Sequence, residues 1–220
     1  MDLTKKEMKQ VGGKVMNKRT FHNLWRNLQC QLISGQDFEA FILLRGADEL
    51  RKVFEILPTL SEERIKKVIQ ILTIGMKSYA HLHYIHIYRH FRNYKGNNWY
   101  NIYTPEVVRK LCTEDLTIEE KITFLGLVTF HPNGYCREEA LKRLILIGYH
   151  ESLKFILMRC NDHVENIREL ALIYIKDRVE KEQIEDISRY IAWINHMPMY
   201  KKAYTNELYG CIYEKLETRG

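Results

Sequence analysis

Apolar side chains recur along this chain at intervals of three and four residues, the spacing of the buried side of an α-helix. A short segment shows the pattern clearly, with Leu153, Ile156, Leu157 and Cys160 at positions i, i+3, i+4 and i+7. The closest approach to a strand-like alternation, residues 81–87, lies inside a longer helical pattern and has no hairpin turn beside it. The pattern therefore predicts an all-α fold.

Prolines and capping residues indicate where several of these helices begin. Each of the four prolines stands just ahead of a predicted helix or at its first position. Residues 104–106, Thr-Pro-Glu, combine an N-cap, a proline at the first helical position and an acid in the first turn. Thr59 with Glu62, and Thr117 with Glu120, have the spacing of a capping box. We expect a further helix from about residue 201 to 217.

One stretch of the chain occurs twice. Residues 131–141 align with residues 162–172 at an offset of 31, which places Arg137 over Arg168 and Ala140 over Ala171. Each copy opens a helix, and the helix between them completes a unit of two antiparallel helices. A single pair of helices cannot cover its own apolar stripe, so similar pairs must stack on it. Residues 104–130 are predicted to supply one more such pair.

The repeated stretch resembles a HEAT repeat, whose second helix opens with an Asp-Pro-x-x-x-Val-Arg-x-x-Ala pattern. The first copy has the proline, arginine and alanine but His131 in place of the aspartate, and the second has the aspartate, arginine and alanine but His163 in place of the proline. The resemblance implies an α-solenoid of antiparallel helix pairs, in which the aspartate and arginine form hydrogen-bonded ladders between repeats. The residues assigned structural roles in the repeats are Pro105, Arg109, Pro132, Arg137, Ala140, Asp162, Arg168 and Ala171.

Composition and length suit one elongated domain. The chain has 220 residues, and we expect a basic N-terminal arm over residues 1–20 followed by a single HEAT-like domain over residues 21–220. No leader sequence and no apolar run of about 20 residues is evident, which argues against a membrane protein. The five cysteines include no Cys-x-x-Cys pair. We therefore expect a cytoplasmic protein.

Charge is distributed unevenly along the chain. Residues 64–110 contain nine Lys and Arg against a single acid, Glu106, whereas residues 111–220 contain 15 bases and 18 acids. A local basic excess is typical of a surface that binds an acidic partner, but it can also be divided between two faces and remain solvated. Both interpretations stay open at this point.

The basic segment contains the residue types that bind nucleic acid. Arg89, Arg92 and Lys95 share one helical spacing, and Trp99 and Tyr100 add rings on which a base could stack. Some HEAT-like proteins are alkylpurine DNA glycosylases that hold DNA in a basic groove. Those enzymes need a catalytic acid in the groove, and the one acid of the segment is explained by its place in the first turn of a helix. Binding of DNA or RNA is therefore the alternative hypothesis, without catalysis.

A metal site is the other chemistry that this region suggests. His83, His86 and His90 fall at i, i+3 and i+7 and could project from one face of a helix. No carboxylate lies within a turn of them, and partly buried histidines packed among tyrosines explain the pattern equally simply. We expect no metal and no cofactor.

No catalytic constellation is evident elsewhere. Cys136 and Cys160 lie near His131 and His163 in sequence, but their positions within the apolar stripes indicate that they are core residues. The leading hypothesis is a non-enzymatic scaffold that binds another protein or peptide through the face on which the second helices line up. A neutral face would favour a protein partner, and a basic one would favour a polyanion.

Overall fold

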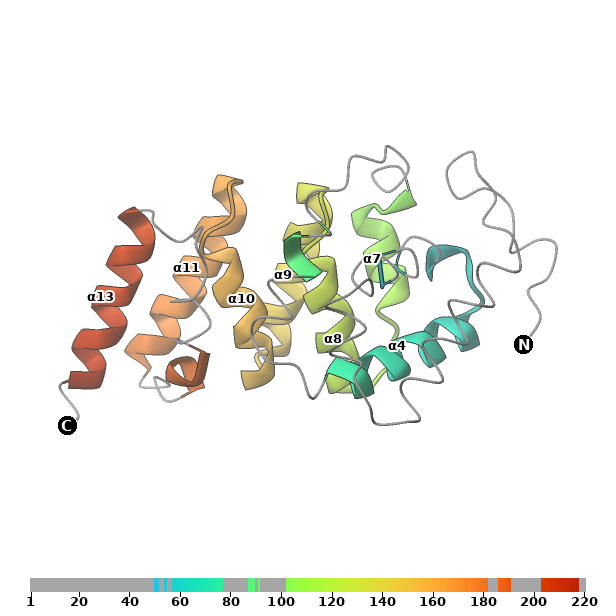
Figure 1. The fold of residues 1–220 in the computed structure, drawn as a ribbon, viewed down its shortest axis with the longest axis horizontal. Helices are drawn as coiled ribbons and strands as arrows, with labels where there is room; N and C mark the ends of the chain where they lie inside the picture. The colour runs from blue at the N-terminus through green and yellow to red at the C-terminus, as the bar shows by residue number, and fades with distance from the viewer. Residues whose placement is uncertain are drawn as a thin grey trace.

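The structure is a computed structural model that describes residues 50, 51, 54, 57–76, 87–89, 91, 102–181, 186–190 and 203–217. Within these ranges every regular element is a helix and no strand occurs, so the prediction of an all-α fold is confirmed. Figure 1 shows the helices following one another along the long axis of the molecule, from α4 near the N-terminus to α13 near the C-terminus. The elements are η2 (Leu57–Thr59), α4 (Glu62–Met76), α7 (Pro105–Leu111), α8 (Ile118–Val128), α9 (Gly134–Ile147), η3 (His150–Ser152), α10 (Leu153–Arg159), α11 (Glu165–Glu180) and α13 (Ala203–Glu217).

Two of the three helix starts predicted from capping residues are confirmed. Thr104 caps α7 with its side chain, and Pro105 occupies the first turn of that helix. Thr117 and Glu120 form the predicted capping box at the start of α8. The capping box predicted for Thr59 is wrong. This residue belongs to η2, and α4 begins only at Glu62, because the 3-10 turn takes up the residues that would otherwise have preceded the helix.

Glycine ends α9 for a conformational reason. Gly148 adopts a left-handed backbone with φ of 64°, and its N–H donates to the carbonyl of Leu144. Residues with a Cβ adopt this conformation at a cost, so glycine is the common choice where a helix stops sharply. The carbonyl of Gly148 in turn accepts a hydrogen bond from Arg178 of α11, at 2.7 Å.

Helices α7, α9 and α11 lie side by side and point the same way. The start of α9 is joined to the start of α11 by Arg137 and Asp162, and its end is joined to the end of α11 by the Gly148–Arg178 hydrogen bond. Arg109 of α7 contacts Glu139 of α9 at 2.9 Å in the same manner. These three helices form one row, and the chain returns to that row after each of α8 and α10.

Helices α8 and α10 form the second row. Their ends are joined by Arg159, whose Nη1 donates to the carbonyl of Thr129 at 2.8 Å. Further along, the helices approach so closely that a Cβ on Gly126 would lie 2.3 Å from the ring of Phe155. Contacts within each row recur at one sequence separation, since the pairs 109 and 139, 129 and 159, and 148 and 178 each lie 30 residues apart.

The core lies between the two rows and continues toward the N-terminal side. Ala140 of α9 and Ala171 of α11 are completely buried, and Cys136 and Cys160 are buried as well. At the other end Tyr103 stacks against Phe54 and donates a hydrogen bond to its backbone carbonyl at 2.7 Å. None of the helices in the described ranges is long and apolar enough to cross a membrane.

Candidate functional site

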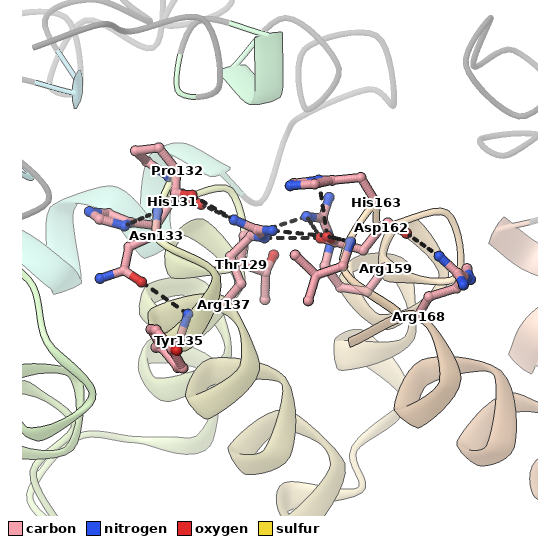
Figure 2. A network of polar contacts seen from close by, with 11 residues as sticks. Thr129, His131, Pro132, Asn133, Tyr135, Arg137, Arg159, Asp162, His163 and Arg168 are labelled. Atoms are coloured by element: carbon pink, nitrogen blue, oxygen red, sulfur yellow. Dashed lines mark hydrogen bonds and ion pairs between the residues drawn. The ribbon is translucent and has the colours of Figure 1, made fainter. Parts of the chain in front are cut away.

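The most elaborate polar structure in the described ranges surrounds the carboxylate of Asp162. Arg137 reaches it with two parallel bonds, Nε to Oδ2 and Nη2 to Oδ1, each 2.9 Å long. Arg159 donates to Oδ2 at 2.9 Å, and the backbone N–H of Val164 donates to Oδ1 at 3.0 Å. Figure 2 shows these contacts converging from α9, α10 and the segment before α11. One carboxylate therefore joins three helices.

The two arginines of this cluster make further contacts with carbonyls and rings. Arg137 donates from Nη1 to the carbonyls of His131 and Pro132, at 3.0 and 2.8 Å. The guanidinium of Arg159 lies 5.0 Å from the centroid of the Tyr88 ring and 5.8 Å from that of Phe130. Such stacking on aromatic faces and fork-like bonding to a carboxylate are the ways in which arginine is tolerated in a core.

The arginines set the protonation of Asp162. Burial alone would raise the pKa of its carboxyl group. The nearby guanidiniums of Arg159 and Arg137 and the N–H of Val164 outweigh that effect, and the pKa of Asp162 lies well below its ordinary value. The carboxylate is therefore ionised under ordinary conditions. With two arginines and one aspartate enclosed, the arrangement is suited to holding helices together rather than to chemistry on a substrate.

Arg168 occupies the matching place in the second copy of the repeat. Its Nη1 donates to the carbonyl of Asp162, six residues earlier, as Arg137 does to the carbonyl of His131. It meets the carboxylate of Glu165 at 3.7 Å, and its side chain is 18% exposed. Arg109 differs again, because it lies on the surface and pairs with Glu106 at 2.6 Å and with Glu139 at 2.9 Å.

A cavity of about 350 Å³ opens where α4, α8 and η3 meet. Lys154 lines it, and burial lowers the pKa of this lysine, an effect that the neighbouring Glu151 carboxylate opposes. Glu151 accepts from Lys154 at 3.3 Å and from the hydroxyl of Tyr190 at 3.4 Å. The lining carries charges of both signs, from Glu119, Glu151 and Lys154, so it does not select one class of ligand.

The outward side of the α7, α9 and α11 row has a different character. Three large apolar side chains are exposed on it, namely Tyr135 (74%), Leu146 (84%) and Ile173 (67%). The charged groups around those on α9 are paired with one another, as in Lys142 with Glu138 at 2.6 Å and Arg143 with Glu139 at 2.8 Å. We use the name outer row for the exposed residues Tyr135, Lys142, Leu146, Glu169, Ile173 and Glu180 of α9 and α11.

Few of the residues proposed for nucleic-acid binding fall within the described ranges. Arg89 is described and is exposed, while its neighbour Tyr88 packs against the core. Arg92, Lys95, Trp99 and Tyr100 lie outside the described residues, and so do His83, His86 and His90. Two other bases of the same segment are neutralised, because Lys66 pairs with Asp115 at 3.0 Å and Arg109 pairs with two glutamates.

The two repeat cysteines have the core role predicted for them. Burial raises the pKa of Cys136 and of Cys160 to about 12, so both are thiols rather than nucleophilic thiolates. Among the residues that the structure describes, no three His, Cys, Asp or Glu side chains are grouped so as to hold a metal ion.

Sequence reasoning missed Arg159 and Lys154. Arg159 stands three residues before Asp162, an aspartate that the repeat pattern had already singled out, and this nearness in sequence was the available signal. Lys154 and Glu151 also lie three residues apart, but so do many solvated pairs, and the cavity beside them depends on α4 and α8. Comparison of the chain with protein-family models, with curated proteins and with solved structures finds no match.

Proposed function

We propose that the chain is a HEAT-like α-solenoid that acts as a non-enzymatic scaffold and binds another protein through its outer row. The alternation of the helices between two rows supports the solenoid, as do the side-chain contacts that recur 30 residues apart. The Arg137–Asp162 pair is the inter-repeat contact that the resemblance implies. A rigid array of this kind presents side chains at fixed spacings to a partner.

The exposed apolar side chains of the outer row carry the functional proposal. Isolated apolar residues on a surface are common and need no explanation. Here Tyr135 and Leu146 are 11 residues apart on α9, which places them on one helical stripe, and Ile173 occupies on α11 the position that Lys142 occupies on α9. Several exposed apolar side chains on one side of a molecule, with polar groups between them, are a feature that protein-binding surfaces share.

The same surface is poorly suited to a polyanion. Phosphate binding requires several uncompensated Lys and Arg side chains on one face. On α7 and α9, however, Arg109, Lys142 and Arg143 are each held by a glutamate. These carboxylates would repel a phosphate backbone, so a protein partner is favoured over DNA or RNA.

Site-specific photo-crosslinking tests the proposal. A photoreactive phenylalanine analogue placed at Leu146, or separately at Ile173, should give one or a few discrete adducts in the native cell. The same phenylalanine analogue placed at Glu114, which is exposed on the segment between α7 and α8, is the control and should give no adduct. Adducts that resist nuclease and disappear with protease would support a protein partner. Adducts removed by nuclease, or the same pattern at all three positions, would contradict it.

A further inference from the structure

The charge of the outer row indicates which kind of protein segment it would bind. Glu169 and Glu180 are exposed on α11, on either side of Ile173 along the helix, and neither forms an ion pair with another described residue. The exposed bases nearby are already used, since Lys142 pairs with Glu138 and Lys181 pairs with Asp177 at 2.9 Å. The uncompensated charge of the outer row is therefore negative.

We infer that the outer row binds a cationic amphipathic helix, and this inference rests on the protein-binding function proposed above. Leu146 and Ile173 would contact the apolar stripe of that helix, while Glu169 and Glu180 would pair with Lys or Arg at its edges. Helices that bind to helical surfaces present apolar anchors at i, i+3 or i+4, and i+7, with charged residues on either side. The outer row offers complementary groups of both kinds.

Two of the three bases of α11, Arg168 and Arg178, are used in contacts with the packed structure. Arg168 and Arg178 belong to the same helix and could in principle neutralise these carboxylates. Both instead donate to backbone carbonyls of the packed structure, Arg168 to Asp162 at 3.1 Å and Arg178 to Gly148 at 2.7 Å. These contacts withdraw two of the three bases of α11 from its outer face, and the third, Lys176, is half-buried, whereas Glu169 and Glu180 are exposed.

Electrostatic complementarity also argues against the other occupants of such a surface. An acidic or phosphorylated segment would meet Glu169 and Glu180 at close range and be repelled. A second copy of this chain would have to offer bases that are not already paired, as Lys66 and Arg109 are. A free cationic helix meets neither obstacle.

Peptide binding to the purified full chain tests this inference directly. The probe is a fluorescent Leu/Lys peptide with an apolar stripe of helical period, about 18 residues long so that it can form a helix. Two matched peptides accompany it, one with every lysine replaced by glutamate and one with the same composition in scrambled order. Anisotropy titration should show binding of the Leu/Lys helix and at least about tenfold weaker binding of either matched peptide.

Variants of the protein locate the binding. We expect two double variants to bind the Leu/Lys peptide with about tenfold lower affinity than the wild type. One is Glu169→Gln with Glu180→Gln, and the other is Leu146→Ala with Ile173→Ala. The control pairs are Glu63→Gln with Glu114→Gln, and Ile74→Ala with Ile118→Ala, which alter residues of the same kinds exposed elsewhere. They should leave binding unchanged. All the substituted side chains are exposed, and equal melting temperatures would verify that each variant folds.

Three results would overturn the inference. The first is equal loss of binding in the control pairs, and the second is preference for the glutamate peptide. The third is a concentration-dependent mass in sedimentation equilibrium that Leu146→Ala with Ile173→Ala abolishes, because a second copy would then be the occupant. If Leu146 crosslinks to a neutral or acidic protein while the Leu/Lys helix fails to bind, the scaffold function stands and only the cationic helix is rejected.

Discussion

The two copies of the repeat place an arginine in the same register and give it different surroundings. Arg137 is fully buried and shares a carboxylate with Arg159, whereas Arg168 is partly exposed and meets the exposed carboxylate of Glu165 at 3.7 Å. Both donate to the carbonyl six residues earlier, so the local backbone motif is the same. What differs is the buried carboxylate that the following copy supplies to Arg137.

The difference between Arg137 and Arg168 corresponds to a difference in the residues that lie one repeat later in the sequence. Asp162 belongs to the second copy and binds the arginine of the first. The residue 31 positions after Asp162 is Trp193, whose side chain has no carboxylate. In the first copy, His131 stands at the position that Asp162 has in the second, and Arg109 lies on the surface. Within the described residues, a buried arginine–aspartate pair of this kind joins α9 to α11 and does not join α7 to α9.

Removing the carboxylate should have the largest effect on stability. Asp162→Ala leaves Arg137 and Arg159 buried without this counter-ion, and breaking a buried pair in this way costs about 3–5 kcal/mol. Arg168→Ala should cost less, because its side chain is partly solvated and its contacts with described residues are a bond to the Asp162 carbonyl and a longer contact to the exposed Glu165. Urea unfolding monitored by circular dichroism measures both values.

The double variant Asp162→Ala with Arg137→Met sharpens this comparison. Methionine approximates the length of the arginine stem without its charge, so part of the lost stability should return. Equal destabilisation by Asp162→Ala and Arg168→Ala would contradict the distinction between the two copies.

Overpacking tests whether the two copies share a register in the core. Ala140 and Ala171 are both completely buried, at equivalent positions of α9 and α11. Ala171→Leu and Ala140→Leu should each destabilise by about 1–3 kcal/mol, because a well-packed site cannot take a larger side chain without strain. Ile173→Leu, two residues away and exposed, is the matched control and should have almost no effect. An unchanged melting temperature in either alanine variant would argue against equivalent sites.

The ionised state of Asp162 predicts how stability depends on pH. Its pKa is lower in the folded protein than in the unfolded chain, so it stabilises the fold fully above the unfolded value near 4 and progressively less as the pH falls below it. In that acid range, the wild type should lose up to about 1.4 kcal/mol per pH unit from this one group. Asp162→Asn should lack that part of the slope, whereas Glu165→Gln, beside the partly exposed arginine, should retain it. Identical slopes in wild type and Asp162→Asn would contradict the assignment.

Several features of the fold could be predicted from sequence because they depend on local physics. The capping box at Thr117 and Glu120 and the end of the last helix at Glu217 follow from spacing within a few residues. The cap at Thr59 was predicted wrongly, because a 3-10 turn competed for the same residues. The contact of Arg159 with Asp162 is local, but its bond to the carbonyl of Thr129 joins residues 30 positions apart. The place of Lys154 at the cavity likewise depends on helices distant in sequence, since Thr73 of α4 lines the same cavity.

The candidate binding surface was predictable only in part. That α9 and α11 would line up follows from the 31-residue offset. The offset does not show which of the charged side chains would be used in the interior. From sequence, Arg168 and Arg178 look like the exposed bases Lys142 and Lys181. Their inward hydrogen bonds require the backbone carbonyls of Asp162 and Gly148 to lie where the stacked helices place them.

The smallest effect is expected when bases are removed from the basic segment of residues 64–110. This segment differs from the outer row in the sign of its charge. If Arg89, Arg92 and Lys95 formed a phosphate-binding row, replacing all three with glutamine would flatten the salt dependence of duplex binding by about three units per logarithm of salt concentration. We expect instead that the wild type and this triple variant bind DNA and RNA duplexes equally poorly. Counterion release needs several uncompensated bases on one surface, and two of the described bases in this segment, Lys66 and Arg109, are already paired with carboxylates. Tight binding by the wild type at physiological salt, lost in the triple variant, would reverse the order of the two proposed functions.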